Sequence, residues 1–163
     1  MATELQFSVF KSAYEEENVR YTQLEARAKF YLTLLTFYLA AIAFKFDDVQ
    51  KFASRFGVPL VLYISAGFLL VIALLFTVLA TRIRTYEAPY DLREIVESFG
   101  AKPPTDADFI VDRMADCVVA TERNCRVNNS VANWLQGASW LLFAAVCLHF
   151  STFLWAYIHQ LRQ

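Results

Sequence analysis

Charged side chains are absent from two long runs of this chain, residues 58–81 and residues 134–158. An apolar run of about 20 residues is long enough to cross the hydrocarbon core of a bilayer as one helix. Hydrophobic residues make up 57% of the whole sequence, against about 45–50% in soluble domains. The two runs therefore predict a multi-pass membrane protein rather than a water-soluble enzyme domain.

Glycine, proline, cysteine and histidine are all scarce, and each shortage excludes a class of structure or site. Four Gly and four Pro are few for a β-rich or loop-rich chain. The glycines are isolated, so there is no Walker loop and no GxGxxG motif. Three cysteines form no disulfide framework, and two histidines form no HExxH motif or zinc set. We therefore expect no enzyme, no metal and no cofactor.

Apolar and aromatic residues recur at alternating steps of three and four along the first part of the chain. The seam is continuous apart from Glu17, and comprises Phe7, Phe10, Tyr14, Glu17, Tyr21, Leu24, Ala28, Tyr31, Leu35, Tyr38 and Ile42. This spacing predicts one long helix that begins outside the bilayer and continues into it. Lys29 and Lys45 bracket its membrane part and can extend to the two interfaces.

The predicted fold is all-α, with three transmembrane helices, long cytoplasmic helical extensions and assembly into an oligomer. Thr105, followed by Asp106 and Asp108, predicts the start of a second long helix. The segments are the N-terminal helix (1–28), span one (29–45), an external loop (46–57), span two (58–81), a cytoplasmic helical region (82–133), span three (134–158) and an external C-terminus (159–163).

The distribution of basic residues predicts the orientation. Lys45, Lys51, Arg55 and Arg162 flank the spans on one side, and the other 11 of the 15 Lys and Arg residues flank them on the other. Because cytoplasmic segments carry the excess of positive charge, the N-terminus and residues 82–133 should be cytoplasmic.

A collar of arginines and amides at the cytoplasmic surface is the first candidate site. It comprises Arg82, Arg84, Arg123, Asn124, Arg126, Asn128 and Asn129. No acid follows Glu122, so Arg123 and Arg126 are expected to have no local partner. Arg binds phosphate in a fork geometry and Asn both donates and accepts hydrogen bonds, so this collar could hold an anionic ligand. The competing interpretation is the ordinary excess of Arg next to a membrane surface.

The second candidate is His149, which lies inside span three. Steps of three and four connect it to Asn124, Asn128, Val131, Leu135, Ala138, Leu142, Ala145 and Thr152. Because ionisable groups inside a membrane face a bundle interior or a water path, we expect His149, Leu142, Ala145 and Thr152 to line a pore. The alternative is a neutral His that hydrogen-bonds to Ser or Thr of a neighbouring helix.

The order of these features resembles the small multi-pass membrane effectors of bacterial antiphage defence: SLATT-type proteins, Pycsar membrane effectors and the Hailong channel subunit. Glu25-Ala26-Arg27-Ala28 leads into span one, Arg82-x-Arg84-x-Tyr86 with Pro89 follows span two, and Ala132-Asn133-Trp134-Leu135 opens span three. The resemblance implies an oligomer, often a tetramer, in the bacterial inner membrane. It also implies a nucleotide or short oligonucleotide ligand made by a neighbouring nucleotidyltransferase. Compared with many such proteins, we expect no separate nucleotide-binding domain here, so a ligand would have to bind the helical cytoplasmic collar.

The sequence therefore predicts an oligomeric ion channel or pore gated at its cytoplasmic side by an anionic nucleotide or oligonucleotide. One alternative is a non-conducting membrane adaptor that recruits a partner through the Phe7–Leu24 seam. A second alternative is a holin-like lysis protein that forms large nonspecific holes without a ligand.

Overall fold

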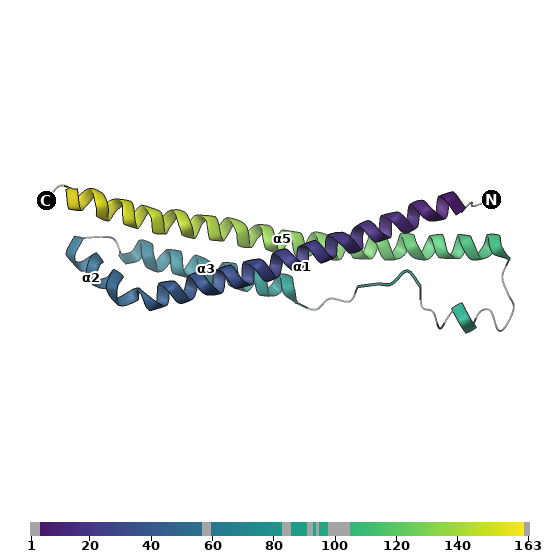
Figure 1. The fold of residues 1–163 in the computed structure, drawn as a ribbon, viewed down its shortest axis with the longest axis horizontal. Coiled ribbons are helices and arrows are strands. Elements are labelled where there is room, and N and C mark those ends of the chain that lie inside the picture. The colour runs from purple at the N-terminus through teal and green to yellow at the C-terminus, as the bar shows by residue number, and fades with distance from the viewer. Residues whose placement is uncertain are drawn as a thin grey trace. The chain divides into compact units, whose positions relative to one another are not determined.

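The computed structural model describes residues 4–56, 60–82, 86–90, 93, 95–97 and 105–161. Its helices are α1 (Glu4–Phe44), α2 (Phe46–Phe56), α3 (Leu60–Thr81) and α5 (Asp106–Leu161), shown in Figure 1. No β-strand occurs within these described ranges. The expected all-helical architecture is therefore confirmed.

Helix α1 forms as its apolar seam predicts. It runs unbroken from Glu4 to Phe44, and all 11 seam positions are buried or half-buried. The chain then turns at Lys45, whose N–H donates to the carbonyl of Ala41 at 3.1 Å. The short helix α2 follows, where the sequence indicated a connecting segment.

Helix α5 begins at the predicted cap. The Thr105 hydroxyl oxygen accepts from the N–H of Asp108 at 3.3 Å and donates to the Asp108 carboxylate at 2.6 Å. These bonds satisfy an N–H group that a helix end otherwise leaves without a partner. Helix α5 then continues to Leu161. It includes residues that the sequence assigned to the cytoplasmic region and residues that it assigned to span three.

The chain divides into two compact units, and α1 and α5 contribute to both. The head unit comprises residues 1–25 and 83–130, and the span unit comprises residues 26–82 and 131–163. In the head unit α1 and α5 run in parallel, because Glu17 contacts Asn128 and Arg20, further along α1, contacts Asn129. In the span unit Tyr38 of α1 contacts His149 of α5.

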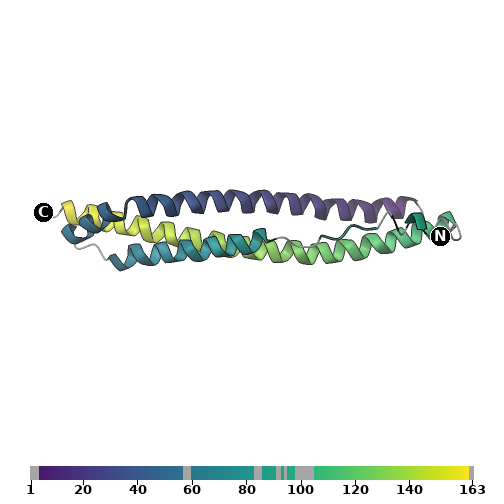
Figure 2. The same cartoon turned by 90° about the horizontal axis from the view of Figure 1, so that it is seen from below.

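In the span unit, α3 packs beside α1 and α5 (Figures 1 and 2). Its core contains Leu35 of α1, Leu70 of α3 and Ala145 of α5, all fully buried. Ala66, Ala73 and Ala80 recur every seven residues on the buried face of α3. Small side chains at this spacing let neighbouring backbones approach closely, which is the usual way that helices associate in lipid.

The outer face of the span unit is apolar. Phe37 on α1 is 73% exposed, Phe68 on α3 is 66% exposed and Trp140 on α5 is 66% exposed. Three helices, α1, α3 and α5, are long and apolar enough to cross a membrane. Large exposed aromatic side chains on all three helices are suited to contact with lipid.

Candidate functional site: the Arg and Asn cluster of the head unit

The head unit holds a short extended segment, residues 86–90, against α5. Asn124 is 1% exposed, and its side-chain amide makes two bonds to the backbone of Glu87. Its Oδ1 accepts from the Glu87 N–H at 3.0 Å, and its Nδ2 donates to the Glu87 carbonyl at 2.9 Å. One buried side chain thus replaces the backbone partner that a β-strand would supply. We call residues 86–90 the strap.

The Glu87 side chain also binds α5. Its two carboxylate oxygens each lie 2.7 Å from Nη1 of Arg123. The strap is fixed further by Tyr86, whose ring lies 4.8 Å from that of Tyr21 on α1. Glu87 is therefore recognised through both its backbone and its side chain.

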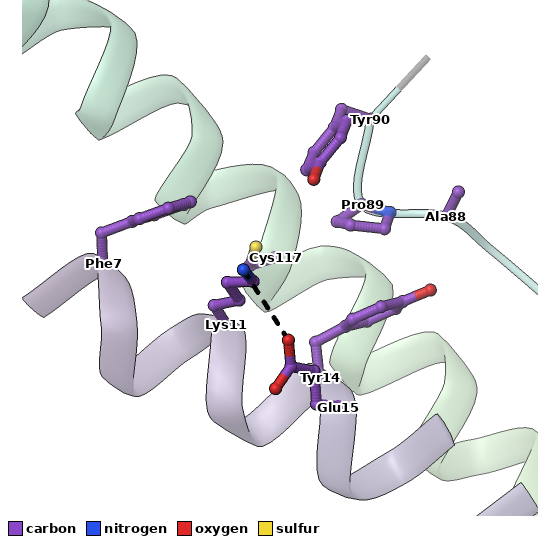
Figure 3. A pocket seen from close by; sticks show the side chains of 8 residues that line it. All are labelled: Phe7, Lys11, Tyr14, Glu15, Ala88, Pro89, Tyr90 and Cys117. Carbon is purple, nitrogen blue, oxygen red and sulfur yellow. Dashed lines mark ion pairs between the residues drawn. The ribbon is translucent and has the colours of Figure 1, made fainter. Parts of the chain in front are cut away.

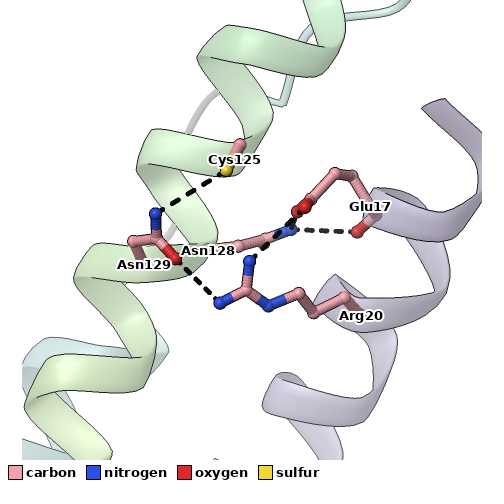
Figure 4. A network of polar contacts seen from close by, with 5 residues as sticks. All are labelled: Glu17, Arg20, Cys125, Asn128 and Asn129. Atoms are coloured by element: carbon pink, nitrogen blue, oxygen red, sulfur yellow. Dashed lines mark hydrogen bonds and ion pairs between the residues drawn. The ribbon is translucent and has the colours of Figure 1, made fainter. Parts of the chain in front are cut away.

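A second polar network joins α1 to α5 in the head unit (Figure 4). The Asn128 amide is fully buried and donates to the Glu17 carbonyl at 2.9 Å and to the Glu17 carboxylate at 2.6 Å. Arg20 donates to Oδ1 of Asn129 at 2.8 Å. Glu17, the one charged position of the α1 seam, is thus the partner of a buried amide.

These contacts correct one expectation from the sequence. Arg123 and Arg126 were expected to have no local partner, but Arg123 pairs with Glu87 at 2.7 Å and Arg126 pairs with Glu122 at 2.6 Å. The second partner lies four residues earlier on the same helix, a spacing at which oppositely charged side chains meet. The first comes from the strap, whose position the helical pattern alone does not give.

The strap also closes one side of a cavity of about 260 Å³ in the head unit (Figure 3). Phe7 and Tyr14 line it from α1, Tyr90 lines it from the strap, and the Cys117 thiol lines it from α5. Cys117 is 1% exposed, and this burial raises the pKa of its thiol, with the nearby Asp116 adding to the effect. The thiol is therefore in its neutral, unreactive form at physiological pH.

The N-terminal seam packs within its own chain. Phe7 and Tyr14 share a cavity with Cys117, and Glu17 binds Asn128. Part of the seam face proposed for an adaptor is thus occupied by α5 and the strap, whereas Phe10 lines a groove that no described segment fills.

The residues predicted to line a pore lie in the interior of the span unit. Ala145, His149 and Thr152 are at most 5% exposed, and Leu142 packs against the core. Ala145 and Leu142 pack against α1 and α3 of the same chain, and His149 contacts Tyr38 and Tyr63. Within one chain the stripe is therefore a packing face, and its role in a pore stays a prediction.

His149 is held by two tyrosines from two other helices. The Tyr38 hydroxyl lies 2.8 Å from Nδ1 of His149, and the Tyr63 ring lies 4.9 Å from the His149 ring at 64°. Nε2 of His149 is buried and has no hydrogen bond partner in the described part of the chain. The alternative interpretation of the sequence was a hydrogen bond to Ser or Thr of a neighbouring helix; the partner on α1 is instead the hydroxyl group of Tyr38.

Of the two remaining predicted site residues, the structure describes one. Arg82 is exposed just after the end of α3, and Arg84 lies outside the described residues. The sequence did not single out Glu87, which joins Arg123 to Asn124. Its signal was present but weak: an acidic residue two positions before a proline, in a segment without helical periodicity.

No family model matches the chain, and no match was found among the curated proteins or the solved structures. Among the residues that the structure describes, no cluster of His, Cys, Asp or Glu could hold a metal ion.

Proposed function

We propose that this chain is the subunit of an oligomeric ion channel or pore in the bacterial inner membrane. Its N-terminus and head unit lie in the cytoplasm, where the head unit binds an anionic nucleotide or oligonucleotide. The observation that carries this proposal is the pairing of Arg123 with Glu87 beside the buried Asn124. The three apolar helices support the membrane placement.

Arg123 already binds an oxyanion, the carboxylate of Glu87. The side chains of the pair are 61% and 37% exposed, so the pair contributes only about 0–1 kcal/mol to stability. A phosphate group accepts charge-assisted hydrogen bonds from Arg at least as well as a carboxylate does. An incoming phosphate can therefore displace Glu87 from Arg123. Arg126 is 76% exposed one turn further along α5 and supplies a second guanidinium group.

The buried amides have a different role from the arginines. Asn124 and Asn128 are at most 1% exposed, so they do not contact a ligand directly. They hold the strap and α1 against α5 through Glu87 and Glu17. A ligand that draws Glu87 away from Arg123 disturbs the strap, and α5 continues from this site into the span unit.

A water-filled pore between subunits requires an exposed helix face that carries more than aromatic side chains. One exposed face of α1 carries Lys29, Thr33, Thr36 and Ala40. The two threonine hydroxyls donate to backbone carbonyls of their own helix, at 3.0 Å for Thr33 and 2.7 Å for Thr36. Each hydroxyl oxygen still has lone pairs for water. We assign this face of α1, in place of the His149 stripe, to the pore.

The binding part of the proposal is tested with purified protein and a fluorescent short oligodeoxythymidylate. Glu87→Gln frees Arg123 and should tighten binding by up to about fivefold, the equivalent of about 1 kcal/mol. Arg123→Gln should weaken binding about tenfold or more. Lys11→Gln removes the same charge from a solvent-exposed pair in the head unit and is the matched control. Equal binding by all four proteins would refute the assignment.

The channel part is tested by single-channel recording in planar bilayers, with and without the oligonucleotide and with cyclic nucleotides. Discrete current steps that respond to one of these anions are expected. Thr36→Trp should reduce the conductance if α1 lines the pore, whereas His149→Ala should change stability more than conductance. A silent bilayer with correctly folded oligomer would refute the channel and favour the adaptor alternative.

A further inference from the structure

The α1–α5 pair of the head unit has two grooves, and the strap fills only one of them. On the strap side, Tyr86 packs on Tyr21 and Glu87 binds Asn124. A second groove of about 520 Å³ is lined by Phe10 and Ala13 of α1 and by Val118, Thr121 and Cys125 of α5. Within the described residues, no other segment lines this second groove.

The groove lies on a heptad stripe of α5. Val118 and Cys125 line it and are spaced by seven residues, and Val111, seven residues before Val118, continues the stripe beyond the groove. The two valines are 51% (Val111) and 43% (Val118) exposed. The buried face of the same helix carries Cys117, Asn124 and Val131, also spaced by seven. A helix with two such stripes is typical of a bundle in which it contacts partners on two sides. Among the described residues of one chain, only one of these sides is covered.

The rim of the groove carries both signs of charge. Glu17 lines it from α1, and Glu122 and Arg126, which pair with each other, line it from α5. Acids and a base around an apolar floor are complementary to the same surface on another copy, where Arg126 can meet a Glu of the neighbour. A strongly acidic or basic partner would instead meet like charge on this rim.

Membrane insertion adds a second reason to choose another copy as the occupant. Copies inserted by the same three helices reach one another with the same orientation, so their head units meet in parallel. Confinement to one membrane also raises the effective concentration of the copies relative to a soluble partner. We propose that the groove of Phe10, Ala13, Val118 and Cys125 is the contact surface between head units of neighbouring copies. This proposal rests on the membrane placement given above.

Two adjacent valines provide a matched pair of variants. Val118 lines the groove and is 43% exposed, whereas Val119 does not line it and is 46% exposed. Neighbouring residues on a helix point about 100° apart. Val118→Glu places a charge in the groove and should raise the dissociation constant of the oligomer about tenfold or more, as measured by light scattering in detergent and by mass photometry in nanodiscs. Val119→Glu should leave the dissociation constant unchanged.

The native cysteines report the same contact in membranes. A variant with Cys117→Ser and Cys147→Ser retains only Cys125, which lies in the groove. A short bismaleimide should cross-link this variant between copies, and adding Val118→Glu should abolish the product. Circular dichroism and continued protection of Cys117 from maleimide in the Val118→Glu protein show that the head unit remains folded.

Each result has one meaning for the groove. Loss of the oligomer in Val118→Glu alone, together with loss of the Cys125 cross-link, supports the proposal. Equal dissociation constants for Val118→Glu and Val119→Glu overturn it. A monomeric wild-type protein also overturns it, and so does the finding that a different protein covers Cys125. A wild-type oligomer that fails to conduct refutes the proposed channel but leaves the groove assignment intact. A conducting oligomer that tolerates Val118→Glu refutes the groove assignment alone.

Discussion

Gly137 is the position at which one added methyl group tests the packing of the span unit. A Cβ atom there would lie 2.8 Å from Cδ2 and 2.9 Å from Cε2 of Phe76 on α3. The Phe76 ring is itself fixed, because its centroid lies 5.1 Å from that of Trp134 with the planes at 85°. Gly137→Ala must therefore move the ring or separate α3 from α5, at a cost of about 1–3 kcal/mol.

Gly67→Ala is the matched control for this change. It makes the same substitution in the middle of α3, where the new Cβ meets nothing within 4 Å. Both variants gain the same helix propensity, up to about 1 kcal/mol, so this gain cancels when they are compared. The difference in unfolding free energy should equal the steric cost of about 1–3 kcal/mol, which corresponds to a gap of about 2–12 °C in Tm.

The assay is thermal and denaturant unfolding in detergent, followed by tryptophan fluorescence because Trp134 contacts the ring that moves. A double-mutant cycle with Phe76→Leu should show coupling with Gly137→Ala, since removing the ring relieves the overlap. Equal midpoints for the two alanine variants, or a cycle without coupling, would refute the packing of Gly137 against Phe76.

Three further predictions concern the buried polar groups. Asn128→Asp replaces the donor to Glu17 by a carboxylate oxygen, so it should cost about 3 kcal/mol or more at pH 7; because the new carboxyl has a raised pKa in the folded state, acidification should restore stability in denaturant titrations. Tyr38→Phe removes the hydrogen bond to His149 and should cost about 0.5–1.5 kcal/mol by thermal unfolding; a neutral result would show that the bond contributes nothing. Burial raises the pKa of the Cys117 thiol, so Cys117 should react with iodoacetamide more slowly than Cys125 at pH 8, and the stability that this neutral thiol contributes should fall as pH rises above about 8.5. Mass spectrometry of the alkylated peptides and unfolding curves at several pH values measure these two effects.

The helices of this protein could be predicted from local sequence features. The seam from Phe7 to Ile42 gave the length and the buried face of α1, and Thr105 gave the start of α5. The stripe through Asn124, Ala138 and His149 gave the buried face of α5. In each case amphipathic or polar positions mark one face of a helix. On α3 nearly every residue is apolar, so its buried face of Ala66, Leu70 and Ala73 could not be distinguished from its lipid-facing side.

The candidate site could be predicted only in part. The sequence singled out Arg123, Asn124 and Asn128 by their residue types, but it did not give their partners. Glu87 lies 37 residues from Asn124 along the chain, and Glu17 lies 111 residues from Asn128. Such pairs have no periodic spacing, so only the folded chain brings them together.

The sequence by itself determined that this protein is helical, that three of its segments can cross a membrane, and which faces of α1 and α5 are buried. These properties depend on the spacing of apolar residues and on the absence of charge over a bilayer's thickness, both of which are local. Only the tertiary structure decided that the His149 stripe packs within the chain, that Arg123 already binds a carboxylate, and that no described segment fills one groove of the head unit. Those outcomes depend on which distant segments of the chain meet. The free energy of such contacts depends on burial and on partner residues far away in the sequence, which a local pattern does not reveal.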